Sequence, residues 1–270
     1  MARRNANQRY HDRVAGRYEE IYSDSYWQWH DGLTWDYLKP FLPSDQSRPV
    51  VDLGCGTGKW GRKLLKSGYR VTFVDLSVKM LDQARSEVEQ MGCLEKADFR
   101  QADLEDLSTL SPGTFALALA MGEPICCTRS PVRALREIQR ILGTAGVLVA
   151  TLDHRLSGMD FYLEHRQIDE LERFVKTGRT HWLTRRTEEQ FEVHTFEVEA
   201  LGRFFADAGL ELLETIGKTV LPMRKCRDWL DDSDIRRRLA RMEKQLSRKP
   251  AAWGRCSHLQ VAARKTSLET

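Results

Sequence analysis

The chain has 270 residues, of which 41% are hydrophobic and 30% charged, and its mean hydropathy is −0.51. Its longest purely apolar run, residues 115–121, is far too short to span a bilayer, and residues 1–13 lack the apolar segment of a secretory signal. A formal net charge of +3 is too small to indicate nucleic-acid binding. We therefore expect a cytoplasmic protein without a membrane anchor, and we do not expect nucleic acid as its partner.

Segments of strand type alternate with segments of helix type from about residue 48 to 153. Ser77 is placed to cap one of these helices, and Pro131 to open another at its first turn. The predicted strands are 48–53, 69–75, 97–103, 114–121, 147–153, 210–217 and 258–265, and the predicted helices are 59–66, 78–91, 131–142 and 199–208. This order predicts an α/β fold with a doubly wound, mostly parallel sheet and helices on both faces.

No repeat, low-complexity tract or obvious linker divides the chain. We therefore expect a single domain over residues 1–270. Residues 1–40 are expected to form N-terminal lid helices, and about 154–196 and 219–256 to form helical inserts on the substrate side.

A glycine-rich segment, Asp52-Leu53-Gly54-Cys55-Gly56-Thr57-Gly58, follows the first predicted strand and precedes a helix. Glycines there let the backbone turn sharply and approach a ligand that a Cβ would block. In an open α/β sheet, ligands lie beyond the carboxyl ends of the strands. The dinucleotide pattern G-x-G-x-x-G and the phosphate-loop pattern are absent, because the glycines fall at positions 54, 56 and 58. An acid at position 52 favours a cationic ligand over an anionic pyrophosphate.

The run VVDLGCGTGKW, residues 50–60, resembles the first motif of the class I, Rossmann-like S-adenosylmethionine-dependent methyltransferases. The resemblance implies a seven-stranded sheet whose last strand is antiparallel, with S-adenosylmethionine as the cofactor. It also implies which residues of this segment hold the methionine end of the cofactor: Asp52, Gly54, Cys55, Gly56 and Gly58.

The same resemblance assigns residues at the ends of the following strands. Asp75 ends the second strand and is expected to bond both ribose hydroxyls, and Asp103 follows the third and is expected to bond the adenine amino group. The remaining expected cofactor contacts are their neighbours and the end of the fourth strand, beside the methyl group: Leu76, Ala102, Leu104 and Met121. A simpler alternative is that Asp75 and Asp103 only cap the helices that follow them.

The N-terminal segment 10–18 resembles the amphipathic lead-in helix of small-molecule methyltransferases, which folds over the cofactor. The resemblance places Tyr18 near the methionine carboxylate. The aromatic residues that follow it, Trp29 among them, are candidates for the wall of a substrate pocket, and the alternative is an ordinary cap packed on the core.

Residues for the acceptor chemistry are less clearly marked. Glu123, after the fourth strand, is a candidate substrate contact, because that strand end lies beside the methyl group in the family. A hydroxyl acceptor would need a base, for which His30 and His154 are the favoured candidates and His181 and His194 the others. The six cysteines show no zinc spacing, so we expect free thiols and no metal.

These features predict methyl transfer to an oxygen, nitrogen or carbon atom of a small organic molecule, by a monomer or homodimer. An RNA or protein methyltransferase is the nearest alternative, with the basic segment 236–249 as its docking surface. A solvated amphipathic helix is the simpler reading of that segment. A cofactor-binding regulatory partner without catalysis is an alternative of another class.

Overall fold

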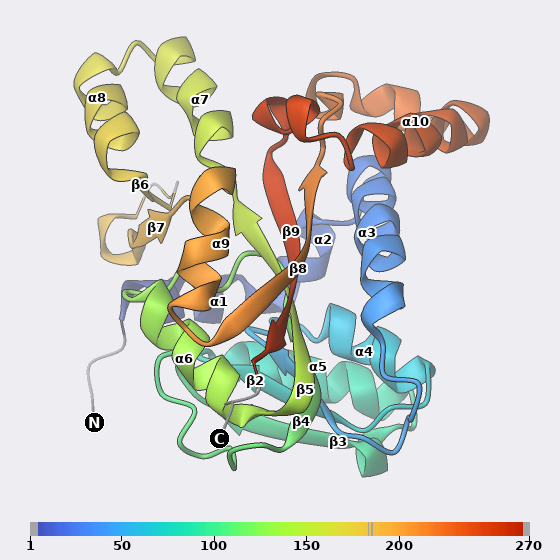
Figure 1. Ribbon diagram of the computed structural model, residues 1–270. Helices are drawn as coiled ribbons and strands as arrows, with labels where there is room; N and C mark the ends of the chain where they lie inside the picture. Colours follow the sequence, from blue (N-terminus) through green and yellow to red (C-terminus); the bar gives the residue numbers. More distant parts are fainter. Residues whose placement is uncertain (1–4, 183, 185, 267–270) are drawn as a thin grey trace.

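A computed structural model describes residues 5–182, 184 and 186–266, and its centre is a seven-stranded sheet (Figure 1). In spatial order the strands are β3 (Ala97–Gln101), β2 (Val71–Asp75), β1 (Val50–Leu53), β4 (Phe115–Ala120), β5 (Leu142–Asp153), β9 (His258–Lys265) and β8 (Leu210–Lys218). Neighbouring strands from β3 to β5 pair in parallel, whereas β9 is antiparallel to both β5 and β8. The predicted mostly parallel sheet with an antiparallel last strand is confirmed.

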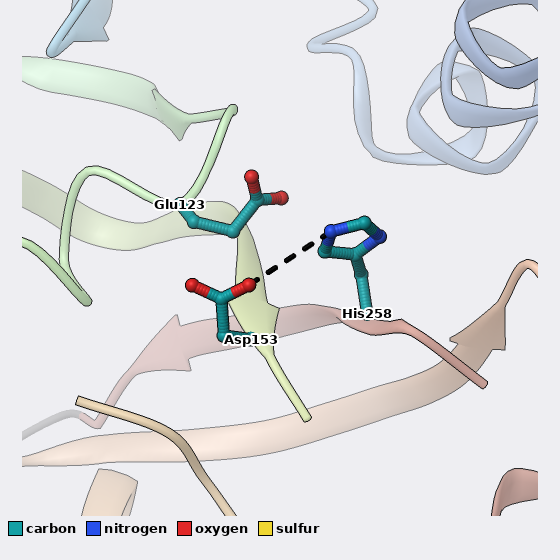
Figure 2. Close-up of side chains that lie close together, drawn as sticks. All are labelled: Glu123, Asp153 and His258. Carbon is teal, nitrogen blue, oxygen red and sulfur yellow. Dashed lines mark ion pairs between the residues drawn. The ribbon is translucent and has the colours of Figure 1, made fainter. Parts of the chain in front are cut away.

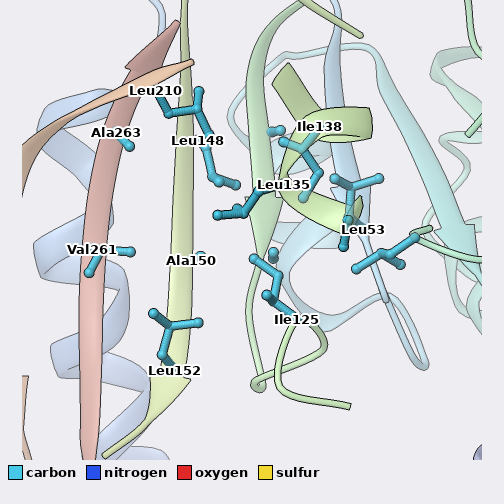
Figure 3. Packing of buried hydrophobic residues seen from close by; sticks show 14 of the residues in the cluster. Leu53, Ile125, Leu135, Ile138, Leu148, Ala150, Leu152, Leu210, Val261 and Ala263 are labelled. Atoms are coloured by element: carbon cyan, nitrogen blue, oxygen red, sulfur yellow. The ribbon is translucent and has the colours of Figure 1, made fainter. Parts of the chain in front are cut away.

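Helices cover both faces of this sheet, and each buries the apolar stripe that its sequence predicts. Buried residues of α4 (Lys59–Lys66) and α5 (Val78–Gln90) pack with those of β1 and β2 on one face. On the other face, α6 (Pro131–Ile141) and α9 (Val198–Ala206) pack against β5, β8 and β9. Figure 3 shows Leu135 and Ile138 of α6 directed at Leu148, Ala150 and Leu53 in the interior.

Two helices begin at the capping residues that the sequence predicts. The Ser77 hydroxyl accepts a hydrogen bond from the Met80 N–H and begins α5, and Pro131 occupies the first turn of α6. Strand β5 begins at Leu142, directly after α6 ends at Ile141, whereas the sequence predicted its start at position 147. The pairing of β5 with β4 shifts register in this stretch, so Gly143 and Gly146 lie within an irregular strand.

The N-terminal helices and the two predicted inserts lie around one end of the strands of the sheet. The N-terminal part holds α1 (Ala6–Val14), α2 (Tyr18–Ile21) and α3 (Ser25–Leu38). The first insert holds α7 (Met159–Glu164), α8 (Ile168–Thr177) and the hairpin β6 (Arg179–His181) and β7 (Glu192–His194), and the second holds α10 (Ser233–Leu246). Residues 1–4, 183, 185 and 267–270 of the predicted lid, insert and domain lie outside the described residues.

Strands β5 and β8 point toward the end of the sheet at which α7, α8 and α10 lie (Figure 1). The carboxyl ends of the parallel strands lie at this end, where ligands of α/β proteins bind. Within the part of the chain that the structure describes, no helix is both long and apolar enough to cross a membrane.

Candidate active site

The carboxyl ends of the strands border a cavity of about 650 Å³. One part of it, here called the glycine-loop half, is lined by residues that follow β1 to β4: Gly54, Cys55, Gly56, Asp75, Leu76, Asp103, Leu104 and Met121. The other part, here called the charged half, is lined by residues after β4 and around β5, β8 and β9: Glu123, Asp153, Lys218, Arg224 and His258. A cavity of this size and position is typical of a small-molecule site.

Backbone conformation explains why glycines follow β1. Gly54, Gly56 and Gly58 have φ values of +64°, +54° and +82°, a region that residues with a Cβ rarely adopt. A Cβ on Gly54 would lie 2.4 Å from the Cβ of Pro124, in the segment after β4. The two halves of the cavity therefore touch at Gly54, and a side chain there would push them apart.

Asp75 lies in the middle of the glycine-loop half and is 8% exposed. Its two carboxylate oxygens accept hydrogen bonds from the backbone N–H groups of Gly56 and Ser77, each at 2.8 Å. Burial raises the pKa of this carboxyl. Because Ser77 rather than Asp75 caps α5, the capping alternative does not account for Asp75.

Several other predicted cofactor residues line the same half. Asp103 accepts a hydrogen bond from the Glu105 N–H at 3.0 Å, which holds the turn after β3. Its neighbour Leu104 is buried, and Leu76 lies in the same wall. Tyr18 reaches the loop from α2, with a ring carbon 3.9 Å from the position of a Cβ on Gly56. These predicted contacts thus converge on one surface.

Three predicted cofactor residues, Asp52, Gly58 and Ala102, are not among the residues that line the cavity. Asp52 is 1% exposed, and its carboxylate accepts a hydrogen bond from the Gly61 N–H at 2.7 Å, so it anchors the first turn of α4. Gly58 begins α4 and packs against Phe73. Ala102 packs against the core beneath β3. Each of the three residues faces the protein interior and supports the cavity-lining loops from that side.

The N-terminal helices enclose the cavity together with the first insert. The Arg13 guanidinium donates to both carboxylate oxygens of Glu189 at 2.6 Å, and the Tyr10 ring meets Trp182 edge-on at 5.4 Å between centroids. On its other side α1 packs on α5, so the segment is both a lid and a cap on the core. Two segments that lie far apart in the sequence thus border the cavity together.

Glu123 lies where the segment after β4 turns toward the charged half. It has a φ of +59°, which is uncommon for a residue with a side chain. The backbone N–H groups of Gly122 and Glu123 donate to the Thr151 hydroxyl of β5 at 2.8 Å and 3.2 Å. This anchor holds Glu123 on the cavity, where burial raises the pKa of its carboxyl.

Asp153, His258 and Lys218 are neighbours across three adjacent strands. His258 of β9 pairs in register with Asp153 of β5 on one side and with Lys218 of β8 on the other. Burial, and next the nearby Glu123, raises the pKa of Asp153 to about 8. Burial also lowers the pKa of Lys218 to about 8, although Glu123 and Asp31 counteract this effect. These titratable side chains all line the cavity.

Sequence reasoning did not single out Asp153, Lys218 or Arg224, and it considered His258 only as an improbable metal ligand with Cys226 and Cys256. Asp153 ends β5 just as Asp75 ends β2, so the same signal was present for it. Lys218 and His258 become significant only when β8 and β9 pair with β5. Arg224 lies in the short helix η6 (Met223–Lys225), which no sequence pattern marks.

The two predicted bases both border the cavity. His30 of α3 is 8% exposed, its ring centroid is 5.8 Å from that of His258, and burial lowers its pKa to about 4. His154 follows β5 and is 3% exposed, with Nδ1 3.1 Å from the Cys256 carbonyl oxygen. Burial lowers the pKa of His154 as well. His181 also lines the cavity, whereas His194 does not.

The aromatic wall is formed by Trp27 rather than Trp29. Trp29 is 4% exposed and packs in a cluster with residues of the second insert, away from the cavity. Trp27 lines the cavity, and the Arg227 guanidinium lies 6.0 Å from its ring centroid. Two residues turn a helix by about 200°, so a shift of two positions places a side chain on nearly the opposite face.

The basic segment of the second insert forms α10, as predicted. Several of its charges have acidic partners: Arg237 pairs with Asp234, Lys244 with Asp36, and Arg248, beyond the helix, with Glu214. Buried Glu243 accepts hydrogen bonds from the backbone N–H groups of Val220 and Leu221. The helix thus packs on the chain and neutralises part of its own positive charge.

Comparison with known proteins relates this architecture to a family. Residues 50–146 match a model described as the methyltransferase domain. Ubiquinone biosynthesis O-methyltransferase of Aromatoleum aromaticum is 25% identical over 219 residues, which cover 74% of this chain and 87% of that protein. The tRNA U34 carboxymethyltransferase of Hydrogenovibrio crunogenus is 31% identical over 133 residues. That alignment covers 48% of this chain and 39% of that protein, so the likeness is to a part of it.

Solved structures show the same fold at low sequence identity. The CcbJ methyltransferase from Streptomyces caelestis has a TM-score of 0.64 at 16% identity, covering 98% of this chain and 100% of that one. An S-adenosylmethionine-dependent methyltransferase from Methanosarcina mazei has a TM-score of 0.61 at 18% identity, covering 85% of this chain and 97% of that one. The similarity extends beyond the central sheet into the helical inserts.

Proposed function

Because this chain carries a Rossmann-like class I methyltransferase domain that uses S-adenosylmethionine, we propose that it methylates a small organic molecule held in the charged half of the cavity. The acceptor is an oxygen, nitrogen or carbon atom. The observation that carries this proposal is the single cavity of about 650 Å³ that the glycine-loop half and the charged half share. Residues of the N-terminal helices and of the first insert both line this cavity, and the two segments contact each other, which favours a small acceptor over a large polymer.

The glycine-loop half is proposed to hold S-adenosylmethionine, which supplies an activated methyl group when bound. Asp75 would accept hydrogen bonds from the ribose hydroxyls, because its carboxylate lines the cavity beside the loop. Leu76 and Leu104 would border the adenine, and Asp103 would receive its amino group. Tyr18, beside Gly56, would close the methionine end.

The charged half is proposed to hold the acceptor. Methyl transfer from a sulfonium is an in-line displacement, so alignment and exclusion of water supply much of the acceleration. Glu123 follows the strand end beside Met121, and its rigid turn on Thr151 would orient the acceptor. His30 and His154 border the cavity with imidazole rings, and we propose that one of them takes the proton of a hydroxyl acceptor.

The first test combines binding with product formation. Calorimetry is expected to show binding of S-adenosylmethionine and S-adenosylhomocysteine and none of nicotinamide dinucleotides. A panel of small phenols, amines and carboxylic acids is then screened for S-adenosylhomocysteine release. Glu123→Gln should lower turnover of any compound found, whereas Asp98→Asn, at an exposed site on β3, should not. Tight dinucleotide binding without a response to S-adenosylhomocysteine would exclude the proposal, and binding without turnover of any acceptor would favour a regulatory protein.

RNA is the second candidate substrate, because one similar protein is a tRNA U34 carboxymethyltransferase and α10 is basic. Wild-type RNA binding is measured at two salt concentrations and again after neutralisation of four α10 residues: Arg237, Arg238, Arg241 and Lys244. We expect weak binding and unchanged small-molecule turnover, because part of this charge is already paired. Tight, steeply salt-dependent binding that neutralisation abolishes would favour RNA instead.

A further inference from the structure

Three potential metal ligands meet in the charged half. One ligand atom from each of Glu123, Asp153 and His258 lies within 4.8 Å of the others. Figure 2 shows the three side chains converging from three separate segments, with one imidazole nitrogen directed at the carboxylates. Two carboxylates and one imidazole form a donor set that divalent cations such as Mn²⁺ and Zn²⁺ accept.

His258 points independently to a ligand. Its side chain is more than nine-tenths buried, and its Nδ1 has no hydrogen-bond partner among the described residues. Its Nε2 faces Asp153 at 3.8 Å, which is beyond hydrogen-bond distance. A buried polar ring without partners is unfavourable, and a bound ion between Nε2 and the carboxylates would give Nε2 a partner, although it would not supply one to Nδ1.

The supporting residues make this arrangement rigid. Asp153 and His258 are paired in register on adjacent strands, so their backbones cannot move apart without breaking the sheet. Glu123 is fixed through the two hydrogen bonds of its turn to Thr151. A site on sheet residues holds its geometry before the ion arrives.

We propose that Glu123, Asp153 and His258 bind a divalent cation in the acceptor part of the cavity. Three protein ligands leave further coordination positions toward the cavity, where water or an oxygen of the acceptor can bind. A cation there would orient that oxygen and stabilise its deprotonated form. This role rests on the proposed function, whereas the binding itself does not.

Positive groups in the same cavity give the proposal a second consequence. Lys218 pairs in register with His258, and Arg224 also lines the cavity, so both would oppose a cation. His30 borders the site as well, and Asp31 adds a negative charge that Lys59 neutralises at 2.8 Å. Removing the charge of Lys218 should therefore tighten cation binding. An anionic acceptor bound between the cation and Lys218 would also tighten cation binding.

The experiment measures cation binding without any acceptor. Purified full-length protein is freed of metal and titrated with Mn²⁺, observed by electron paramagnetic resonance, and with Zn²⁺, observed by calorimetry. We expect one equivalent of at least one cation to bind. Asp153→Asn and His258→Gln should each weaken binding at least tenfold, and Lys218→Met should tighten it severalfold. Control variants Asp98→Asn and His194→Gln change an acid and a histidine outside the cavity and should change affinity less than twofold.

Folding is checked in each variant by S-adenosylhomocysteine affinity, which uses the other half of the cavity. Loss of cation binding with this affinity retained supports the proposal. Absence of binding for both cations, or equal affinity in wild type, Asp153→Asn and His258→Gln, would overturn it. Weaker binding in Lys218→Met would overturn it too, because the cation would then lie elsewhere. None of these results affects the proposed methyl transfer, which the acceptor screen tests separately.

Discussion

The two halves of the cavity differ in how their polar groups are satisfied. In the glycine-loop half, Asp75 and Asp103 receive hydrogen bonds from backbone N–H groups within the same or the next loop. In the charged half, His258 Nδ1 has no partner within the described residues, and neither has Nε2 of the neighbouring His30. The loops of the first half are therefore held by local hydrogen bonds, whereas the second half contains buried polar atoms that the described residues leave unsatisfied.

The largest expected effect is on cofactor binding in the glycine-loop half. Asp75→Ala should weaken S-adenosylhomocysteine binding at least tenfold, because two charge-assisted hydrogen bonds contribute about 1.5–3 kcal/mol each. Calorimetry provides the measurement. Asp98→Ala, an exposed acid on the neighbouring strand, should leave affinity unchanged. Equal affinity in wild type and Asp75→Ala would mean that this carboxylate only supports the loop.

A smaller effect concerns Asp52, the acid beneath the glycine loop. Burial raises its pKa from 3.8 to about 7, although the Gly61 N–H counteracts the shift. The folded state thus binds a proton more tightly than the unfolded state, and the free energy of unfolding should fall as pH rises from about 4 to 7. Between pH 5 and 7 the loss should be about 2 kcal/mol. Denaturant unfolding measures it, and Asp52→Asn should flatten this pH dependence. The same slope in both proteins would contradict the assignment.

Gly54 tests the contact between the two halves. Gly54→Ala places a Cβ against Pro124, so we expect a stability loss about 1–2 kcal/mol greater than for the control Gly92→Ala. Gly92 has a nearly identical φ of +65° with open space around it, so it carries the backbone strain alone. Thermal unfolding and S-adenosylhomocysteine affinity are measured for both. If the two variants behave alike, steric contact with Pro124 is not what requires glycine.

The smallest expected effect on stability concerns the ion pair that joins α1 to the first insert. Arg13→Gln removes the ion pair between α1 and Glu189 of the first insert, and it should lower the free energy of unfolding by less than about 1 kcal/mol. Turnover of an acceptor should fall more than stability, because the pair joins two segments that enclose the site. Arg203→Gln, which removes an exposed helical pair, is the control. A stability loss as large as that of Gly54→Ala would make the pair part of the core rather than of a lid.

Sequence reasoning reached one half of this site far more completely than the other. Gly54, Asp75 and Asp103 could be predicted from the sequence, because each lies at the end of a strand that the local sequence pattern indicates. The inward orientation of Asp52 depends on the packing of α4, which a motif does not encode. Similarly, Trp27 and Trp29 are distinguished by the rotation of α3 against the second insert.

Apart from Glu123, the residues of the charged half could not be predicted from the sequence, for a different reason. Its residues come from positions 123 to 258, and register between β5, β8 and β9 brings them together. Such pairing is a property of the assembled sheet, so no local pattern identifies Lys218 or His258 as part of a site. The acid at the end of β5 is the exception, because it follows the same rule as Asp75.

The position of β9 between β5 and β8 has a consequence for the order in which the protein is made. Strand β8 leaves the ribosome before β9, yet its neighbour in the sheet is β9. Until residues 258–265 are synthesised, β5 presents an unpaired edge that can associate with other chains, and β8 has no place in the sheet. The nascent chain can thus form the glycine-loop half early, while the charged half waits for its last strand.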